Sequence, residues 1–469
     1  MSALPGQDLE VQLEDMRMRA DPLADNTIAA LLGPWTNLQQ AARGNNENWA
    51  VLDFINAQMA QWQSNGGLDA WKTDSPNDDA LTRELKAYVR AGIGLPAWAD
   101  PVRIERAEKL FMDYGMLSCT LLFCSSLPEC YVIPDLAAVL HVAGQLEAHT
   151  DHRIRSTAAM IFPVMMIGGL TRPEGGGLPQ VLKVRLIHAM IRNLILRGNP
   201  SDATRADQVP ALEQGGITNM HRALFSHGWD LARDGVPCSQ DELAYTLLTF
   251  GYVFLRSMRK LGLGLPHEDE LAYLHAWNVM GHVLGMETTL MAETMEEGEA
   301  LFARLQARGR ADQPLVHDVR PALGQALMKT MENVIPLHAI KPFPVLLTRY
   351  LCGKTTAKDI GIDHRVPWYS RMLFWVVMMI TRGIDALGRL VFPGFSMCRM
   401  ITRVVGYQFT VRVLMDQTRP LKLPPALLGQ VNSMTGSWHV DPHAPKWINK
   451  LEQRLTGRGP QAGSTEARQ

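Results

Sequence analysis

Apolar residues recur at the i, i+3, i+4, i+7 spacing of an amphipathic helix along almost the whole chain. Alternating apolar and polar runs bounded by Asn-Gly or Asp-Gly turns, the pattern typical of strands and hairpins, are almost absent. A chain whose segments each offer one apolar stripe can bury those stripes by packing helix against helix. The sequence therefore predicts an all-α protein.

Polar loops and changes in composition divide the chain of 469 residues into four parts. Residues 1–95 are predicted to form a helical N-terminal extension, interrupted by turn formers such as TDSPNDD at 73–79. Residues 96–360 alternate apolar-periodic helices with short loops and are predicted to form the core domain. Residues 361–455 form an apolar, arginine-rich helical region, and residues 456–469 have too little apolar content to bury and are predicted to be disordered.

Composition and charge indicate an ordinary globular protein. Apolar residues make up 46% of the chain, charged residues 20%, and the formal net charge is -1, so no global field favours a nucleic-acid partner. The N-terminal stretch MSALPGQDLEVQLEDMRMRADPLADN is polar and acidic, without the basic and apolar regions of a secretory signal. We therefore expect an intracellular, cytoplasmic protein.

The cysteines are expected to be free thiols, since a chain this long needs no disulfide framework. The six are Cys119, Cys124, Cys130, Cys238, Cys352 and Cys398. The first three follow a C-x4-C-x5-C spacing, which matches neither a zinc pair nor a plant-type iron–sulfur motif. Burial as small apolar side chains is their expected role.

Residues 365–425 combine apolar turns with arginines. The stretch MLFWVVMMIT at 372–381 is too short to span a bilayer and is followed at once by Arg382. Further arginines stand at 389, 399, 403 and 412, and the acids of the segment are Asp385 and Asp416. Such a segment suits packing on the protein's own core with the guanidinium groups directed outward, which is the commoner case, or peripheral association with an anionic membrane.

The helix predicted over KVRLIHAMIRNLI, residues 183–195, places a histidine in a buried run. On a helical wheel the apolar side chains Val184, Ile187, Ile191 and Ile195 lie on one side of His188. Arg185 and Arg192 lie together on the other side. Haem requires such a set: an imidazole nitrogen for the iron, aliphatic walls for the macrocycle and cations at the rim for the propionates. The alternative is a hydrogen-bonded histidine of the core.

Upstream, Arg153 and Thr157 stand at i and i+4 in HTDHRIRSTAAMIF and share one helical face. Both donate hydrogen bonds, which stabilise dioxygen as it gains negative charge at a metal. The alternative is an exposed arginine beside a threonine bonded to its own helix. The glycine-rich loop from Gly168 to Gly177 would let this helix and the His188 helix face each other across a pocket.

Five blocks in the same order resemble the latex-clearing protein (rubber oxygenase) family and the wider MpaB-type oxygenases, over about residues 105–355. The blocks are LFCSSLPECYVIPDLAAVL (122–140), the Arg153-x-x-x-Thr157 pair, KVRLIHAMIR (183–192), HGWDLARDGVPCSQDELAYTLLTFGYVFLRSMRKLGL (227–263) and AYLHAWNVMGHVLGM (272–286). The five blocks in this order indicate the family far more specifically than any single block does.

This resemblance implies a globin-like helical core that holds haem b, with His188 as the proximal iron ligand and Arg153 and Thr157 on the distal side. It implies an oxygenase whose partners are dioxygen and an apolar, unsaturated small molecule. The best-studied members of the family cleave an isoprenoid carbon–carbon double bond.

Three features depart from the rubber-cleaving members. Those proteins are exported, whereas no export signal is found here. Some carry a lysine directly before the distal threonine, where this chain has Ser156, which is no strong-field ligand. Their carboxylate base has no clear counterpart, and the nearby acids are Glu129, Asp135 and Glu147. We therefore expect a membrane-soluble isoprenoid or another unsaturated lipid as the substrate.

The other histidines are assigned structural or surface roles. His275 and His282 are seven residues apart on one helix face and are expected to be core residues, with support of the site as the alternative. His149 and His152 form an i, i+3 pair without an evident third ligand, so surface positions are expected. The chain has no pair of Glu-x-x-His motifs for a di-iron centre.

Two other functions compete with a haem dioxygenase. The first is a haem-binding sensor or carrier without turnover, which Ser156 and the unplaced base leave open. The second is a cofactor-free helical protein that docks on membranes through residues 365–425.

Overall fold

The computed structural model describes residues 13–144, 160–213, 215, 219–310, 318–335 and 337–391. Within these segments the regular structure is helical apart from two short strands, β1 (Gln208–Val209) and β2 (Trp229–Asp230). The strands pair antiparallel, with Gln208 opposite Asp230 and Val209 opposite Trp229. The prediction of an all-α fold with helical extensions is confirmed.

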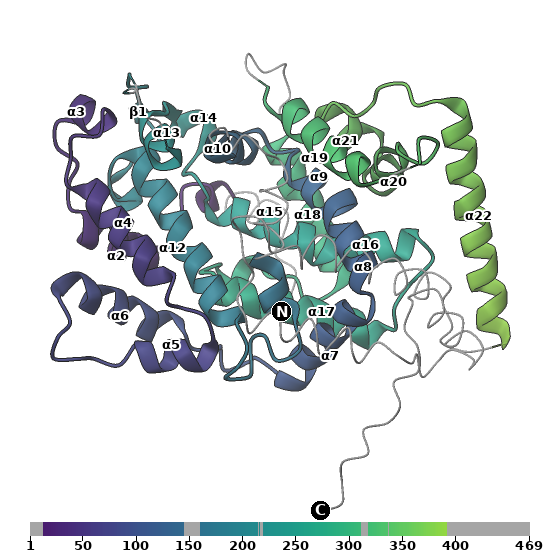
Figure 1. Cartoon of the computed structure of the whole chain (residues 1–469), viewed down its shortest axis with the longest axis horizontal. Coiled ribbons are helices and arrows are strands. Elements are labelled where there is room, and N and C mark those ends of the chain that lie inside the picture. Colours follow the sequence, from purple (N-terminus) through teal and green to yellow (C-terminus); the bar gives the residue numbers. More distant parts are fainter. Residues whose placement is uncertain are drawn as a thin grey trace, which may run out of the picture.

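The N-terminal helices lie along one side of the molecule (Figure 1). They are α2 (Pro22–Leu32), α3 (Leu38–Ala42), α4 (Asn48–Met59), α5 (Asn65–Trp71) and α6 (Ala80–Gly92). Helix α2 packs against α4, α6 and the central helix α12 (Gly177–Leu196). This extension therefore contributes directly to the packing of the helix that carries His188.

The next helices begin the predicted core. They are α7 (Pro101–Asp113), α8 (Gly115–Leu121), the π-helical turn η1 (Leu122–Ser126), α9 (Leu127–Cys130) and α10 (Pro134–Gly144). Asp100 begins α7, and its side chain accepts hydrogen bonds from the backbone N–H groups of Val102 and Arg103. An N-cap of this kind satisfies donors that the first helical turn leaves unpaired. Helix α7 packs along α17 (His267–Val283).

The elements after α12 complete the centre of the molecule (Figure 1). They are η2 (Pro200–Asp202), α13 (Met220–Ser226), α14 (Leu231–Asp234), α15 (Gln240–Phe250), α16 (Tyr252–Lys260), α17, η3 (Thr288–Leu290), α18 (Met295–Gly309) and α19 (Arg320–Val334). Helix α15 contacts α9, α16, α17 and α18, so it is surrounded by helices on several sides. Its buried residues include Leu243, Ala244, Tyr245 and Phe250.

The C-terminal described helices are α20 (Phe343–Cys352), α21 (Lys354–Asp359) and α22 (Trp368–Val391). Helix α22 runs along the outer edge of the molecule, where it contacts α20 (Figure 1). In the described part of the chain, no single helix has both the length and the hydropathy to cross a bilayer; residues 101–113 and 117–130 meet these criteria as a pair bent by 89°. The domain boundaries at 95 and 360 stay predictions, and the tail 456–469 lies outside the described residues.

Candidate functional site

Helix α12 begins after the glycine-rich loop, which the protein holds through side chains from two other helices. Glu108 of α7 accepts hydrogen bonds from the backbone N–H groups of Gly168, at 2.7 Å, and Leu170, at 3.4 Å. Asn65 of α5 donates to the carbonyl oxygen of Gly169 and accepts from the N–H of Leu178 at 3.1 Å. Asn65 therefore satisfies a donor in the first turn of α12, as an N-cap would.

Helix α12 is buried on most of its circumference and partly open along one face. Fourteen of its 20 residues are buried. The six half-buried residues are Gln180, Lys183, Val184, Ile187, His188 and Leu196. The first five follow helical spacing and share one face, which has His188 at its edge. Val184 and Ile187 are half-buried on this face and pack against the edge of the hydrophobic core.

The imidazole of His188 is neutral and has an unsatisfied nitrogen. Its Nδ1 atom is buried and has no hydrogen-bond partner among the described residues. Burial, with a smaller contribution from the positive charge of Arg192, lowers the pKa of His188 to about 3. Buried polar atoms are rarely left without a partner, and a neutral imidazole is the form that binds a metal. A neutral imidazole with an unpartnered nitrogen fits an iron ligand, and this role of His188 stays a prediction.

Arg185 and Arg192 lie on the side of α12 next to His188 and form buried ion pairs with α2. Arg185 makes a bidentate pair with Asp21, with Nη2 to Oδ1 at 2.6 Å, and also donates to the carbonyl oxygen of Val283. Arg192 donates from Nε to Oδ1 of Asp25 at 2.7 Å. Both guanidinium groups are buried, with Arg192 1% exposed and Arg185 9%. Their contact with propionates stays a prediction.

Lys183 is the cation on the half-open face of α12, and it is not among the residues predicted for the site. It is half-buried, and burial lowers its pKa to about 8. No carboxylate of the described residues forms an ion pair with it. A desolvated ammonium group beside apolar Val184 and Ile187 suits the carboxylate edge of a bound group. The signal was present in the spacing of KVRLIH, where Lys183 falls on the apolar side of the wheel.

The predicted distal residues Arg153 and Thr157 lie outside the described residues, as do Ser156, Glu147, His149 and His152. The structure therefore does not test whether these residues face His188. Their roles stay predictions from the resemblance and from the pairing of two hydrogen-bond donors on one helical face.

The two described candidates for a carboxylate base differ in their surroundings. Glu129 is 1% exposed and is engaged by Arg256 at 2.6 Å, by Gln306 at 2.9 Å and by Thr356 at 3.1 Å. A carboxylate held in this way connects helices, and three donors occupy most of its acceptor sites. Asp135 lies instead in a pocket, with Oδ2 3.4 Å from Nη2 of Arg17.

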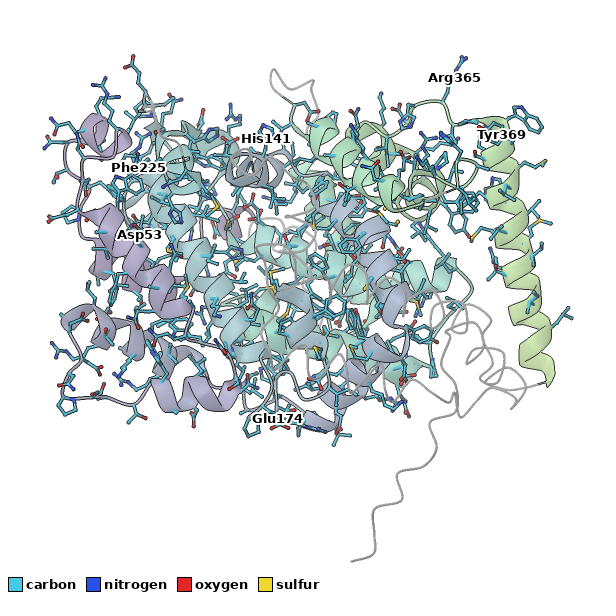
Figure 2. The ribbon with its side chains drawn as sticks, viewed as in Figure 1. Asp53, His141, Glu174, Phe225, Arg365 and Tyr369 are labelled. Atoms are coloured by element: carbon cyan, nitrogen blue, oxygen red, sulfur yellow. The ribbon has the colours of Figure 1, made fainter. Side chains whose placement is uncertain are left out.

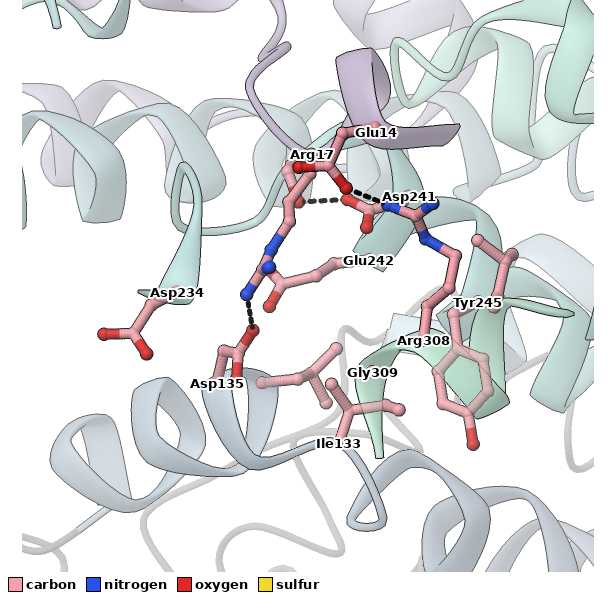
Figure 3. Close-up of a pocket in the computed structure, with 13 residues that line it drawn as sticks. Glu14, Arg17, Ile133, Asp135, Asp234, Asp241, Glu242, Tyr245, Arg308 and Gly309 are labelled. Atoms are coloured by element: carbon pink, nitrogen blue, oxygen red, sulfur yellow. Dashed lines mark hydrogen bonds and ion pairs between the residues drawn. The ribbon is translucent and has the colours of Figure 1, made fainter. Parts of the chain in front are cut away.

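The pocket around Asp135 has a volume of about 270 Å³ and is rich in carboxylates (Figure 3). Its acidic lining residues are Glu14, Asp135, Asp234, Asp241 and Glu242, and its cations are Arg17 and Arg308. Burial, opposed by Arg17 and reinforced by Asp234, raises the pKa of Asp135 to about 7. Burial also raises the pKa of Asp241 and of Glu242, whose Oε1 has no partner among the described residues.

One chain segment connects this pocket to the His188 helix. Arg192, one turn after His188, donates from Nη1 to the carbonyl oxygen of Cys238 at 2.9 Å. Four residues later, Glu242 lines the pocket from the first turn of α15. His188 itself is not a lining residue of the pocket. The pocket is therefore a neighbouring feature that contacts the same helix through the segment 238–242.

The remaining candidates have structural surroundings. Nε2 of His275 accepts a hydrogen bond from the backbone N–H of Asp100 at 2.9 Å, and Trp98 packs edge-on against the rings of His275 and His282. Cys119, Cys124 and Cys130 are buried free thiols, as predicted. Within the described ranges, no group of three or more His, Cys, Asp or Glu side chains is placed to hold a metal ion. Haem iron requires one protein ligand, such as a proximal histidine.

Three comparisons relate this geometry to known proteins. Residues 130–383 match the model of the family described as ER-bound oxygenase mpaB/B'/Rubber oxygenase, catalytic domain. The rubber oxygenase of Streptomyces sp. (strain K30) is 23% identical over 335 residues, which cover 69% of this chain and 70% of that protein. The solved structure of latex clearing protein LCP in the closed state is similar at a TM-score of 0.55, with 18% identity and 90% coverage of both chains. At that identity the structural likeness shows a shared fold.

Proposed function

The chain belongs to the oxygenase family of mpaB/B' proteins and rubber oxygenases, whose model matches more than half of it, and from this membership we propose a haem b-dependent dioxygenase. Its substrate would be an apolar isoprenoid or other unsaturated lipid, of which it cleaves or oxygenates a carbon–carbon double bond. The observation that carries the proposal is His188: a neutral imidazole with a buried, unpartnered nitrogen at the edge of a half-open apolar face.

Haem, when bound, supplies the activation of dioxygen. The protein supplies the rest through its own side chains. His188 would hold the iron, Val184 and Ile187 would contact the macrocycle, and Lys183 would pair with a propionate. Arg185 and Arg192 would fix α12 through Asp21 and Asp25, in addition to any contact with the propionates expected for them.

Arg153 and Thr157 are proposed to donate hydrogen bonds toward the oxygen substrate as negative charge develops there. Asp135 is proposed as the base that accepts a proton, since a pKa of about 7 suits proton transfer near neutral pH. Apolar walls would exclude water and align the alkene with the oxygen. The intracellular location expected from the N-terminal composition remains a proposal, which cell fractionation tests.

The decisive experiment is an absorption spectrum with pyridine haemochrome analysis of the purified full-length protein and of His188→Ala. We expect a Soret band in the wild type and its loss in the variant, because His188 is the proposed iron ligand. His282→Ala removes another half-buried histidine and is the matched control. A wild type that cannot be loaded with haem, or a His188→Ala protein with full haem content, would contradict the proposal.

Oxygen consumption separates the enzyme from a haem sensor or carrier. The ferrous protein is mixed with emulsified squalene, a linear isoprenoid, and dissolved oxygen is followed with an electrode. An oxygenase consumes oxygen in proportion to carbonyl products, and Arg153→Ala should retain haem and lose turnover. A stable oxygen complex without consumption would favour the sensor or carrier.

A further inference from the structure

Helix α22 exposes an unusual amount of apolar surface. Ten of the 15 exposed large apolar side chains in the described part of the chain lie on this one helix. The most exposed are Trp368 at 73%, Met379 at 71% and Leu387 at 67%. Monomeric soluble proteins rarely expose contiguous apolar patches, and such patches are typical of contact surfaces.

The contact of α22 with the protein body is narrow. Ser370 is fully buried and Phe374, one turn later, is 5% exposed and packs edge-on against Phe343 of α20. The opposite side carries Met372, Val376 and Met379, all exposed. Helix α22 therefore uses one edge to attach to α20 and leaves a wide apolar face outward (Figure 1).

Positive charges outnumber negative ones around this face: residues 363–391 contain Arg365, Arg371, Arg382 and Arg389 against Asp363 and Asp385. Residues 364–384 contain the exposed arginines Arg365, Arg371 and Arg382 and no Asp or Glu. Aromatic side chains, which favour the boundary between acyl chains and headgroups, stand at positions 368, 369 and 375. Figure 2 shows Arg365 and Tyr369 at the outer edge of the molecule, directed away from its body. An apolar face bordered by arginines and aromatic rings is typical of an interfacial helix.

The positive charge bordering the apolar face of α22 favours an anionic partner. A second copy of the chain would bring the same three arginines to the interface, and like charges repel. The segment that follows α22, residues 392–415, adds Arg399, Arg403 and Arg412 and has no acidic residue, so it would also bring positive charge. An anionic lipid surface offers both an apolar layer and opposite charge.

We propose that α22 docks the protein on a bilayer that contains anionic lipid, with its outer apolar face at the acyl boundary and its arginines among the headgroups. This surface goes beyond the oxygenase proposal and does not depend on haem. It would bring an enzyme for apolar molecules to the phase in which such molecules dissolve.

The test is flotation of the full-length protein with vesicles of phosphatidylcholine and phosphatidylglycerol, compared with phosphatidylcholine alone. We expect wild-type protein to float with the anionic vesicles and to be released as salt shortens the Debye length. The triple variant Trp375→Ser, Met379→Ser, Ile380→Ser should lower the partition coefficient about tenfold or more. Its control, Trp98→Ser with Val102→Ser, removes exposed apolar side chains elsewhere and should float as the wild type does.

A second variant tests how much the arginines contribute to membrane binding. Arg365→Gln, Arg371→Gln and Arg382→Gln together should reduce binding to anionic vesicles roughly a hundredfold, since each cation near the surface contributes about fivefold. Replacing the exposed Arg43, Arg83 and Arg90 by Gln removes the same charge from another face and should leave binding unchanged.

Three outcomes would overturn the proposal: wild-type protein that stays unbound, α22 variants that float like the wild type, and a dimer in light scattering that the apolar variant converts to a monomer without any vesicle binding. The Soret band of the α22 variants is the independent readout. A variant that no longer floats but retains haem reports on α22 alone. A protein that lacks haem but still floats reports on the oxygenase proposal alone.

Discussion

At the scale of single residues, the central observation is an imidazole that the fold keeps neutral and unsatisfied. The pKa of His188 is about 3 because burial and the charge of Arg192 both oppose protonation. The Nδ1 atom lies in the interior without a described partner, although an unpaired buried polar atom is destabilising. A residue that lowers the stability of the haem-free protein and has the properties of a metal ligand is expected at a functional site.

The first prediction concerns the pH dependence of stability in haem-free protein. An unfolded histidine takes up a proton below about pH 6.5, whereas folded His188 does so only near pH 3, so the unfolded state gains stability as pH falls between these values. Urea unfolding at pH 7 and at pH 5 should therefore show that His188→Gln loses less stability than the wild type, by about 2 kcal/mol. The same substitution at exposed His364 is the control, and an unchanged slope for His188→Gln would contradict the prediction.

The second prediction concerns Lys183 as a partner of the haem propionates. Lys183→Met should weaken haem binding about tenfold, and Lys183→Arg should retain most of it, because a charge-assisted hydrogen bond is lost in the first case only. With a pKa of about 8, the ammonium group is charged below that pH, so wild-type haem affinity should fall as pH rises past 8 and the Met variant should not follow. Titration of apo-protein with hemin, followed at the Soret band, measures both. Equal affinities for Lys183→Met and wild type would remove Lys183 from the site.

At the scale of elements, α12 is fixed to α2 by two buried ion pairs. Asp21 and Asp25 stand one turn apart on or just before α2, and Arg185 and Arg192 stand two turns apart on α12. Gly285 allows the first pair to form: its φ is +94°, and a Cβ atom there would meet Oδ2 of Asp21 at 2.6 Å. The two pairs fix the rotation of α12 about its axis and its position against α2. The four residues therefore position His188.

The third prediction tests the second of these pairs. Asp25→Asn leaves the buried Arg192 charge uncompensated and should lower the free energy of unfolding by about 3–5 kcal/mol, measured by urea titration. The double variant Asp25→Leu, Arg192→Met removes both charges and should recover most of the loss. As a readout specific to positioning, the Soret maximum of haem-loaded Asp25→Asn should shift relative to the wild type. A loss of under about 1 kcal/mol, the range of surface pairs, would contradict this role.

At the scale of the whole molecule, segments distant in sequence build the acidic pocket. Its lining comes from the N-terminal residues Glu14 and Arg17, from α10, from α15 and from the end of α18. Burial raises the pKa of Asp135 to about 7, and the nearby carboxylates of Asp234 and Asp241 add to this rise. This value depends on the tertiary packing, since an isolated aspartate titrates near pH 4.

The fourth prediction follows from this pKa. If Asp135 accepts a proton during turnover, oxygen consumption should rise with pH through about 7, where its carboxylate becomes ionised, and Asp135→Asn should lose activity and this rise together. Haem content should stay at the wild-type level in the variant. Glu129→Gln, by contrast, should lower stability because it disrupts the contacts with Arg256. An Asp135→Asn enzyme with the wild-type pH profile would rule out Asp135 as the base.

The sequence by itself determined the elements and the central residue. Apolar spacing predicted helices, the wheel of residues 183–195 placed His188 at the edge of an apolar face, and ordered blocks indicated the family, because all three depend on residues close together in the chain. Only the tertiary structure decided that Arg185 and Arg192 pair with Asp21 and Asp25, which stand 164 and 167 residues away. It also showed that Asp135 lines a pocket whereas Glu129 is paired with Arg256. Lys183 proved to be the cation on the half-open face of α12. The physical reason is that charge pairing and desolvation depend on which distant segments the packing brings into contact, and periodicity carries no information about that.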